Sequence, residues 1–537
     1  MLVKFRGKFF QIPDPEPEKD EIVVRVEKYI CLPTPNDPKG AMFRFSNKFA
    51  KIKFFFIHEG PLLTYHKVRS SLIQRSIISE KKLVLTYGPR NNDGQYVFAI
   101  GPQDCPASEY HLFPARFSVQ SESSEDFDYI YNILMEYFDK NPKQLSDLYF
   151  YSKYSGIKID FDLKKILENN TSTSWKYKQV KIESFDTKIS NKKLSAQKKI
   201  NHNSTDFPEL FLVGAGAYSC AYILPLMKKV NYNTLVDLNP ILSNILGEKY
   251  GFKRFDTSTE RGLSILSKYD LPILIIATYH STHVPIAEYA LSLNPKTRIM
   301  IEKPPVTDIE QLRQLVKLRK KDQFIEIGYN RRYSRFIKIV KKILTRHEGP
   351  LLINCIIREK GLPISHWYYW PTQGTRIVGN ICHWIDLGVY LIQKKPITIF
   401  AKSVSKKHPT DEPIITILFE DFSALNIIAS EKGNSLRGIQ EIIDIRRDDL
   451  TITIDDFMRM KIQEGGQEKI FHSIIRDKGH KEMYNVFQNN IDKGSSPIYN
   501  DNDLILSSLL YLKIKDMLFK NEKYIELNDE LNIQYGT

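Results

Sequence analysis

The sequence predicts an α/β Rossmann domain followed by an α+β domain with a large, mostly antiparallel open sheet, and an additional β-rich domain at the N-terminus. After about residue 207, apolar runs that suit buried parallel strands alternate with helical patterns, which is typical of a doubly wound sheet. From about residue 350 the strands lengthen and alternate apolar with polar residues, as antiparallel strands do. Residues 171–205 hold eight lysines and two acidic residues, which indicates a solvated linker.

Composition excludes several classes of protein. No uncharged apolar run approaches the ~20 residues of a membrane helix, and the first residues lack the apolar core of a signal peptide. The net charge of +14 is spread over lysines throughout the chain, without the arginine and aromatic clusters of a nucleic-acid surface. We therefore expect a cytoplasmic protein without a membrane or nucleic-acid partner.

The strongest local signal is a glycine-rich turn between a strand and a helix. The strand ends at Val213 and runs into Gly214 and Gly216, and an apolar helix follows. Such a turn brings the helix N-terminus and bare backbone towards a dinucleotide pyrophosphate. Asp237 ends the next strand, where a carboxylate binds ribose hydroxyls and repels a 2′-phosphate. The pattern predicts an NAD site and favours NAD over NADP. A glycine-rich turn that serves packing alone is the alternative.

Two further motifs resemble a known family. Glu-Lys-Pro follows one strand at 302–304, and Gly-Tyr-Asn-Arg-Arg-Tyr follows the next at 328–333. Together with the run 374–386, the strand end at 454–457 and the start of a late helix at 479–482, these resemble the Gfo/Idh/MocA oxidoreductases over residues 207–530. The resemblance is closest to the branch fused behind a zinc-type alcohol dehydrogenase segment.

The resemblance implies an enzyme that moves a hydride between nicotinamide and the hydroxyl or ketone carbon of a sugar, nucleotide sugar or cyclitol. Its motifs place the catalytic pair at Lys303 and His383. Oxidation of an alcohol needs a base for the hydroxyl proton, and either side chain can serve. Many members carry an aspartate where this chain has Gly379, and Asn380 cannot accept a proton in its place. An inactive or altered catalyst is therefore an open alternative.

The remaining candidate residues come from the same motifs and strand ends. For the cofactor, besides the glycines and Asp237, they are Ala217, Tyr218, Leu238, Thr278, Tyr279, His283, Glu302 and Lys303. For the substrate they are Tyr329, Arg332, Trp367, Arg376, Asn380 and His383. Structural readings remain open for several of them: an interior histidine at 283, a salt-bridged arginine at 332, and a domain or subunit contact at Trp367. Asp386 either orients His383 or packs its helix.

The expected boundaries follow from these assignments. We expect a β-rich domain at 1–125, a helical and mixed extension at 126–170, the linker at 171–206, the NAD-binding Rossmann domain at 207–329, and an α+β domain for substrate binding and oligomerisation at 330–537. A homo-oligomer, either a dimer or a tetramer, is expected.

The N-terminal segment resembles a degenerate GroES-like domain of the alcohol dehydrogenases, at its opening hairpin (10–26) and at a later strand (107–117). Cys31, His58 and Glu59 lie roughly where such enzymes hold zinc, but no third ligand is evident and no CxxC pair occurs, so we expect no metal.

Two other functions stay open. One is a noncatalytic NAD-binding scaffold or assembly protein, and the other is imine reduction or NAD-assisted elimination on the same fold. Polysaccharide or natural-product biosynthesis is a setting that suits the predicted substrates.

Overall fold

The computed structural model describes 207–527, apart from 322, 365, 434–437 and 493–495, and parts of the N-terminal region. Those parts are 2–5, 8–11, 21–32, 61, 64–68, 82–103, 110–121, 126–149, 159, 161–169 and 183–184. His58, Glu59 and most of the expected linker lie outside the described residues. The chain divides into two compact units: one comprises Met1–Lys39, Ser71–Gly216 and Asn231–Ile265, and the other comprises Gly40–Ser70, Ala217–Val230 and Leu266–Thr537.

The N-terminal region is rich in β-structure, as predicted. Its described sheets have the orders β8-β6-β5-β4-β9, β3-β7 and β1-β2. The strands are β1 (Leu2–Phe5), β2 (Lys8–Gln11), β3 (Glu21–Arg25), β4 (Lys28–Cys31), β5 (Lys82–Pro89), β6 (Tyr96–Gln103), β7 (Tyr110–Pro114), β8 (Ser118–Gln120) and β9 (Glu183–Ser184). Helices α2 (Phe127–Lys140), α3 (Pro142–Tyr149) and α4 (Leu163–Glu168) share one core with β5 and β6, built around Leu85, Phe98 and Leu134.

The Rossmann domain is built on a sheet with the strand order β12-β11-β10-β13-β14-β15. The strands are β10 (Glu209–Val213), β11 (Asn231–Val236), β12 (Arg254–Asp256), β13 (Ile273–Ile276), β14 (Arg298–Glu302) and β15 (Ile325–Gly328). Every residue of β13 and β15 is buried, as expected for parallel strands covered on both faces. The connecting helices are α5 (Leu224–Leu226), α6 (Pro240–Tyr250), α7 (Thr259–Leu263), α8 (His283–Leu293) and α9 (Ile309–Arg319).

The second sheet follows the Rossmann strands along the chain and is mostly antiparallel. Its described strands have the order β23-β22-β21-β20-β16-β19-β18-β17-β24, with β16 and β19 parallel. They are β16 (Leu352–Arg358), β17 (Pro396–Ser403), β18 (Pro413–Phe419), β19 (Ala424–Ser430), β20 (Gln440–Arg447), β21 (Leu450–Asp455), β22 (Arg459–Glu464), β23 (Gln467–His472) and β24 (Tyr524–Glu526). This confirms the predicted fold class.

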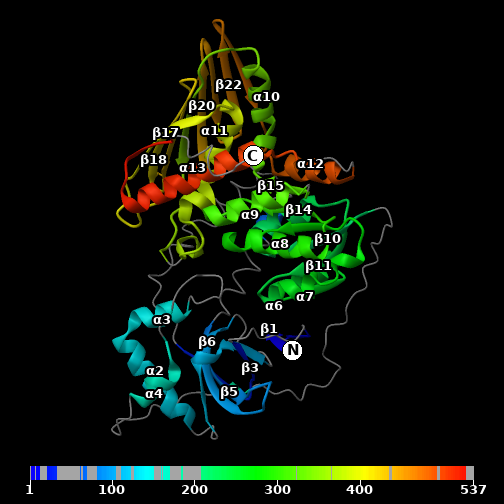
Figure 1. Cartoon of the computed structure of the whole chain (residues 1–537), viewed down its shortest axis with the longest axis vertical. Coiled ribbons are helices and arrows are strands. Elements are labelled where there is room, and N and C mark those ends of the chain that lie inside the picture. Colours follow the sequence, from blue (N-terminus) through cyan, green and yellow to red (C-terminus); the bar gives the residue numbers. More distant parts are fainter. Residues whose placement is uncertain are drawn as a thin grey trace. The chain divides into compact units, whose positions relative to one another are not determined.

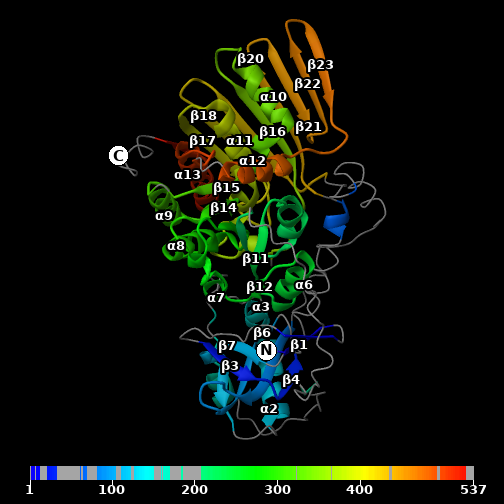
Figure 2. The ribbon, with the colours of Figure 1, turned by 90° about the vertical axis from the view of Figure 1, so that its right-hand side faces the viewer.

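Helices cover this sheet on the side of its buried residues. In β18, for example, Ile415 and Ile417 are buried whereas Ile414 on the opposite face is exposed. Helices α11 (Cys382–Ile392) and α13 (Asp501–Lys520) pack on each other and on strands β19 and β17 (Figure 1). Figure 2 shows α10 (Arg335–Leu344) and α11 in front of the strands, with α12 (His480–Asp492) below them. Among the described residues, no helix is long and apolar enough to cross a membrane.

Candidate active site

The glycine-rich turn is fixed by its own backbone and by Asp237. Gly214 has φ +96°, a conformation that side chains disfavour, and its N–H donates to Val236 O at 2.8 Å. One carboxylate oxygen of Asp237 accepts the N–H of Ala215 at 2.7 Å, and the other accepts the N–H of Asn239 at 2.8 Å. A side-chain carbon at Gly216 would meet nothing within 4 Å. The turn therefore has the shape and the open space that a pyrophosphate group needs.

The side chain of Tyr218, just beyond that turn, reaches a buried carboxylate. Glu302 ends β14 and accepts a hydrogen bond from the hydroxyl of Tyr484 on α12, and Tyr218 interacts with both residues. Burial raises the pKa of Glu302 to about 7, although the tyrosine hydroxyls and Lys303 oppose the rise. Gly328 makes room for this carboxylate, because a side-chain carbon there would lie 2.9 Å from its oxygen.

Lys303 leaves β14 and reaches across to the segment before α11. Its Nζ donates to the carbonyl oxygen of Gly379 at 2.9 Å. His283 contacts the residue after Lys303: one of its ring nitrogens lies 2.8 Å from Pro304 O, and the other lies 3.3 Å from Thr278 O. Burial lowers the pKa of His283 to about 4, so its ring is neutral. These contacts give His283 a role in holding the backbone on either side of the site.

His383 lies in the first turn of α11 and is almost fully buried. Its Nδ1 has no hydrogen-bond partner among the described residues. Burial, reinforced by the nearby charges of Arg331 and Lys303, holds the pKa of His383 well below its usual range. The ring is therefore neutral at physiological pH, and its Nδ1 is a buried polar atom without a partner among the described residues. Tyr329 lies edge-on to it, with ring centroids 6.1 Å apart.

Asp386 and Arg332 are engaged with each other rather than with His383. Arg332 makes two hydrogen bonds to Asp386 and a further ion pair with Asp503 on α13 at 2.5 Å. The hydroxyl of Tyr499 also donates to Asp386 at 2.6 Å. This buried network joins the segment after β15 to α11 and α13, in keeping with the structural readings of Arg332 and Asp386.

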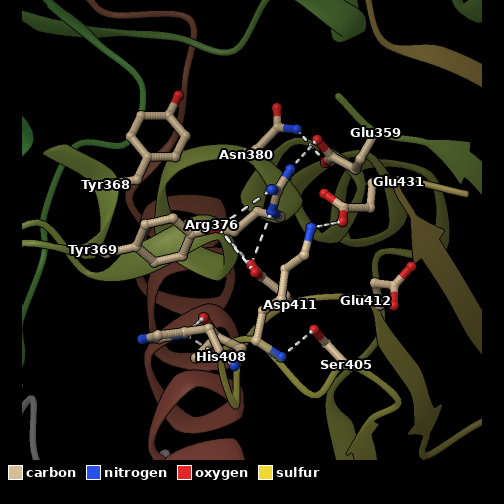
Figure 3. A network of polar contacts seen from close by, with 12 residues as sticks. Glu359, Tyr368, Tyr369, Arg376, Asn380, Ser405, His408, Asp411, Glu412 and Glu431 are labelled. Carbon is tan, nitrogen blue, oxygen red and sulfur yellow. Dashed lines mark hydrogen bonds and ion pairs between the residues drawn. The ribbon is translucent and has the colours of Figure 1, made fainter. Parts of the chain in front are cut away.

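A second buried network surrounds Arg376 and Asn380 (Figure 3). Arg376 pairs with Glu359, at the end of β16, at 2.9 Å and with Asp411 at 3.1 Å. The amide nitrogen of Asn380 also donates to Glu359, which orients the amide. Figure 3 shows the amide oxygen of Asn380 pointing away from Glu359, on the side to which the hydroxyl of Tyr368 points. Asn380 can thus present an acceptor to a substrate hydroxyl.

Aromatic rings surround Gly379. The ring of His280 lies 4.5 Å from Trp367 and 5.3 Å from Tyr368, centroid to centroid, and Tyr279 lies 5.4 Å from Trp367. A side-chain carbon at Gly379 would meet both His280 and Tyr368 at 2.9 Å. The space in which another side chain would stand at position 379 is therefore filled by two rings.

The model of the family described as "Oxidoreductase family, NAD-binding Rossmann fold" (GFO_IDH_MocA) matches residues 209–328. These residues form a Gfo/Idh/MocA domain. No curated protein matches the chain.

Solved structures resemble the Gfo/Idh/MocA domain together with the sheet that follows it. An aldose-aldose oxidoreductase from Caulobacter crescentus, complexed with glycerol, is 18% identical, with 60% of this chain and 100% of that chain covered and a TM-score of 0.52. A scyllo-inositol dehydrogenase from Lactobacillus casei is 13% identical, covering 60% and 99%, with a TM-score of 0.50. An oxidoreductase from Agrobacterium radiobacter in complex with NAD⁺, L-tartaric acid and magnesium is 14% identical, covering 60% and 98%, with a TM-score of 0.50. At these identities the likeness concerns the fold.

The candidate residues fall into three places. Gly214, Gly216, Asp237 and the exposed Leu238 shape the first turn, whereas Ala217 and Tyr218 follow it. Lys303, Tyr279 and Trp367 lie with His280 and Tyr368 around Gly379, Thr278 contacts His283, and Tyr329 lies beside His383. Arg376 and Asn380 meet at Glu359.

The list of candidate residues did not include Glu359, His280, Tyr368 or Tyr484, although the first three lie in or beside segments that supplied candidates. Tyr368 is the neighbour in sequence of the candidate Trp367, and Glu359 follows a predicted strand. A charged residue directly after a buried strand indicates a candidate site residue. No such pattern marks Tyr484, because its helix is distant in sequence from Glu302.

Proposed function

We propose that this chain is an NAD-dependent oxidoreductase that transfers a hydride between nicotinamide and the hydroxyl- or ketone-bearing carbon of a carbohydrate-like molecule. The substrate is a sugar, a nucleotide sugar or a cyclitol, in line with the aldose-aldose oxidoreductase and the scyllo-inositol dehydrogenase that the chain resembles in fold. The observation that carries the proposal is His383, a neutral buried imidazole with an unpartnered nitrogen in the same unit as Lys303.

The turn at 214–216 fits a dinucleotide, because Gly216 leaves open space and Gly214 takes the left-handed conformation. NAD, when bound, supplies the hydride acceptor or donor. Asp237 lies where the ribose hydroxyls are expected, and its negative charge disfavours a 2′-phosphate, so NAD is the proposed cofactor.

The chain's own residues then handle the reacting oxygen. The free nitrogen of His383 forms a hydrogen bond with the substrate hydroxyl, and Lys303 places a positive charge beside the oxygen as it changes charge. Asn380, oriented by Glu359, accepts a hydrogen bond from a neighbouring hydroxyl. The aromatic rings of Tyr279 and Trp367 offer an apolar face to a sugar ring.

The experiment is a redox assay with a panel of keto sugars, nucleotide sugars and cyclitols, in which NADH is followed by its absorbance. We expect turnover by the wild-type protein, and a loss of kcat of about 100-fold or more in both Lys303→Ala and His383→Ala, because each removes a group beside the reacting oxygen.

NADH binding, followed by fluorescence, is the control and should survive both substitutions. A protein that binds NADH but turns over no compound of the panel would support the scaffold alternative, which the absence of a carboxylate at Gly379 favours. NAD that cycles without net accumulation of NADH would indicate elimination.

A further inference from the structure

We propose that Tyr368 is the proton donor to the substrate oxygen in the direction of carbonyl reduction, and that Lys303 supports it electrostatically. This inference rests on the proposed function and names a further catalytic residue for it. It starts from one atom, the carbonyl oxygen of Gly379, at which both side chains converge.

Two donors share that oxygen. The ammonium group of Lys303 is 2.9 Å from it, and the hydroxyl of Tyr368 is 3.4 Å from it. The contact of Lys303 is a good hydrogen bond, whereas that of Tyr368 is long and weak. Because both groups approach the same oxygen, the positive charge of Lys303 lies near the phenol oxygen of Tyr368.

Three neighbouring rings pack around Tyr368 and fix its ring. Rings of His280, His366 and Trp367 lie 5.3, 4.8 and 4.5 Å from it, centroid to centroid. Tyr368 itself is only partly buried, unlike His280. Figure 3 shows its hydroxyl pointing away from the Arg376 network. The hydroxyl therefore faces the side on which Asn380 presents its amide oxygen.

The other candidates for an acid are poorly suited. His383 is neutral, because burial and neighbouring cations hold its pKa well below the usual range, so it lacks the labile proton of an imidazolium. The same holds for His280, whose Nδ1 is also 3.2 Å from Gln373 O. The buried carboxyl of Glu359 is occupied by Arg376 and Asn380. Lys303 is engaged by the carbonyl oxygen of Gly379 at 2.9 Å, whereas the phenol of Tyr368 lies 3.4 Å from it and is the less engaged donor.

The carbonyl carbon gains a hydride from reduced nicotinamide dinucleotide, which is oxidised, and the carbon–oxygen double bond becomes single. The oxygen takes the proton of Tyr368 as the phenol O–H bond breaks. The resulting phenolate is stabilised by the ammonium group of Lys303 until water returns a proton. In the direction of alcohol oxidation the same groups act in reverse.

The test is Tyr368→Phe, which keeps the ring and removes only the hydroxyl. We expect kcat to fall about 100-fold or more, with KM for the carbonyl substrate changed far less. NADH affinity, measured by fluorescence, should be unchanged. The matched control is Tyr524→Phe, which deletes a phenol hydroxyl on the exposed edge strand β24 and should retain wild-type turnover.

A second measurement does not depend on turnover. Tyr368 in the wild-type protein is nitrated with tetranitromethane and mapped by peptide mass spectrometry, alone and with NAD plus the panel compound that supports reaction. We expect that combination to protect Tyr368, because the substrate covers its hydroxyl.

The outcomes are distinguishable. Absence of turnover by the wild-type protein overturns the proposed function and the acid role with it. Wild-type kcat in Tyr368→Phe, or nitration of Tyr368 that the ligands leave unchanged, overturns the acid role alone.

Discussion

Single residues at the glycine-rich turn do more than match a motif. Asp237 was predicted to bind ribose, and in the structure both of its carboxylate oxygens accept backbone N–H groups, one of them from Ala215 inside the turn. A carboxylate has about four lone-pair sites, and two of those of Asp237 accept these N–H groups. The same side chain therefore shapes the turn and sets the charge that a cofactor would meet.

This dual role yields a prediction for Asp237→Arg. The substitution replaces the negative charge with a positive one, so NADH affinity should fall about 10-fold or more while the preference moves towards NADPH. Fluorescence titrations with the two cofactors measure both effects. Asp237→Asn, which keeps an acceptor for the Ala215 N–H, separates loss of the turn from loss of charge. Unaltered NADH binding in the arginine variant would contradict the proposed cofactor site.

The residues that sequence could assign are those whose role depends on local geometry. Gly214 has a positive φ and Gly216 borders open space. Both features can be predicted because the strand, the turn and the helix are contiguous in the chain. Glu359 and Tyr368 could not be assigned in this way. Each acquires its neighbours only when β16, the aromatic segment and the start of α11 come together.

At the level of elements, the strands of the Rossmann sheet were predicted because their continuous apolar runs suit burial on both faces. The segment before α11 was not, since Ile377–Ile381 forms a π-helical turn, entered through left-handed residues Gly374 and Thr375. Such wide turns have no hydrophobic period of their own and are often found at functional sites. This one carries Gly379 and Asn380, the two positions at which the sequence departs from the pattern of the resembled family.

Tyr484 links two elements, α12 and the end of β14, through its bond to the buried carboxyl of Glu302. We expect Tyr484→Phe to lower the free energy of unfolding by about 1–3 kcal/mol, because it leaves a buried polar group with one donor fewer. Urea denaturation measures the change, and Tyr524→Phe on β24 is the control that should alter stability little. Equal stability of both variants would show that the bond contributes nothing net.

Burial shifts the pKa values of two groups of the molecule, His283 and Glu302, in opposite directions. Burial lowers the pKa of His283 from 6.5 to about 4, so the unfolded chain binds a proton first and the fold loses stability as pH falls from 6.5 towards 4. Burial raises the pKa of Glu302 from 4.5 to about 7, so the fold loses stability as pH rises from 4.5 towards 7. Each shift corresponds to about 3 kcal/mol across its window.

Two neutral variants should therefore respond in opposite ways. Relative to the wild-type protein, His283→Gln should gain stability when pH is lowered from 7 to 4.5, and Glu302→Gln should gain stability when pH is raised over the same interval. Urea midpoints at the two pH values measure these differences, and comparison across pH cancels any constant effect of the substitution. Parallel pH profiles for both variants and the wild type would contradict the assigned titrations.

For the whole molecule, the order of the β-rich, Rossmann and α+β domains was predicted from the sequence, because the strands and helices of each type have their own period of apolar residues. The expected linker and the exact domain limits stay predictions. The resemblance of residues 1–125 to a GroES-like domain also stays a prediction, since what the structure adds there is a β-rich region with its own core.

The convergence of Lys303 and Tyr368 on the carbonyl oxygen of Gly379 has a practical consequence for anyone who scans this protein by mutagenesis. No amino-acid replacement deletes a main-chain oxygen, so the atom that aligns the two donors is invisible to an alanine scan. A substitution at 379 would instead push against the rings of His280 and Tyr368 and report crowding. Replacing the peptide bond itself, for example by an ester or thioamide introduced through protein semisynthesis, is the kind of chemistry that could weigh its contribution.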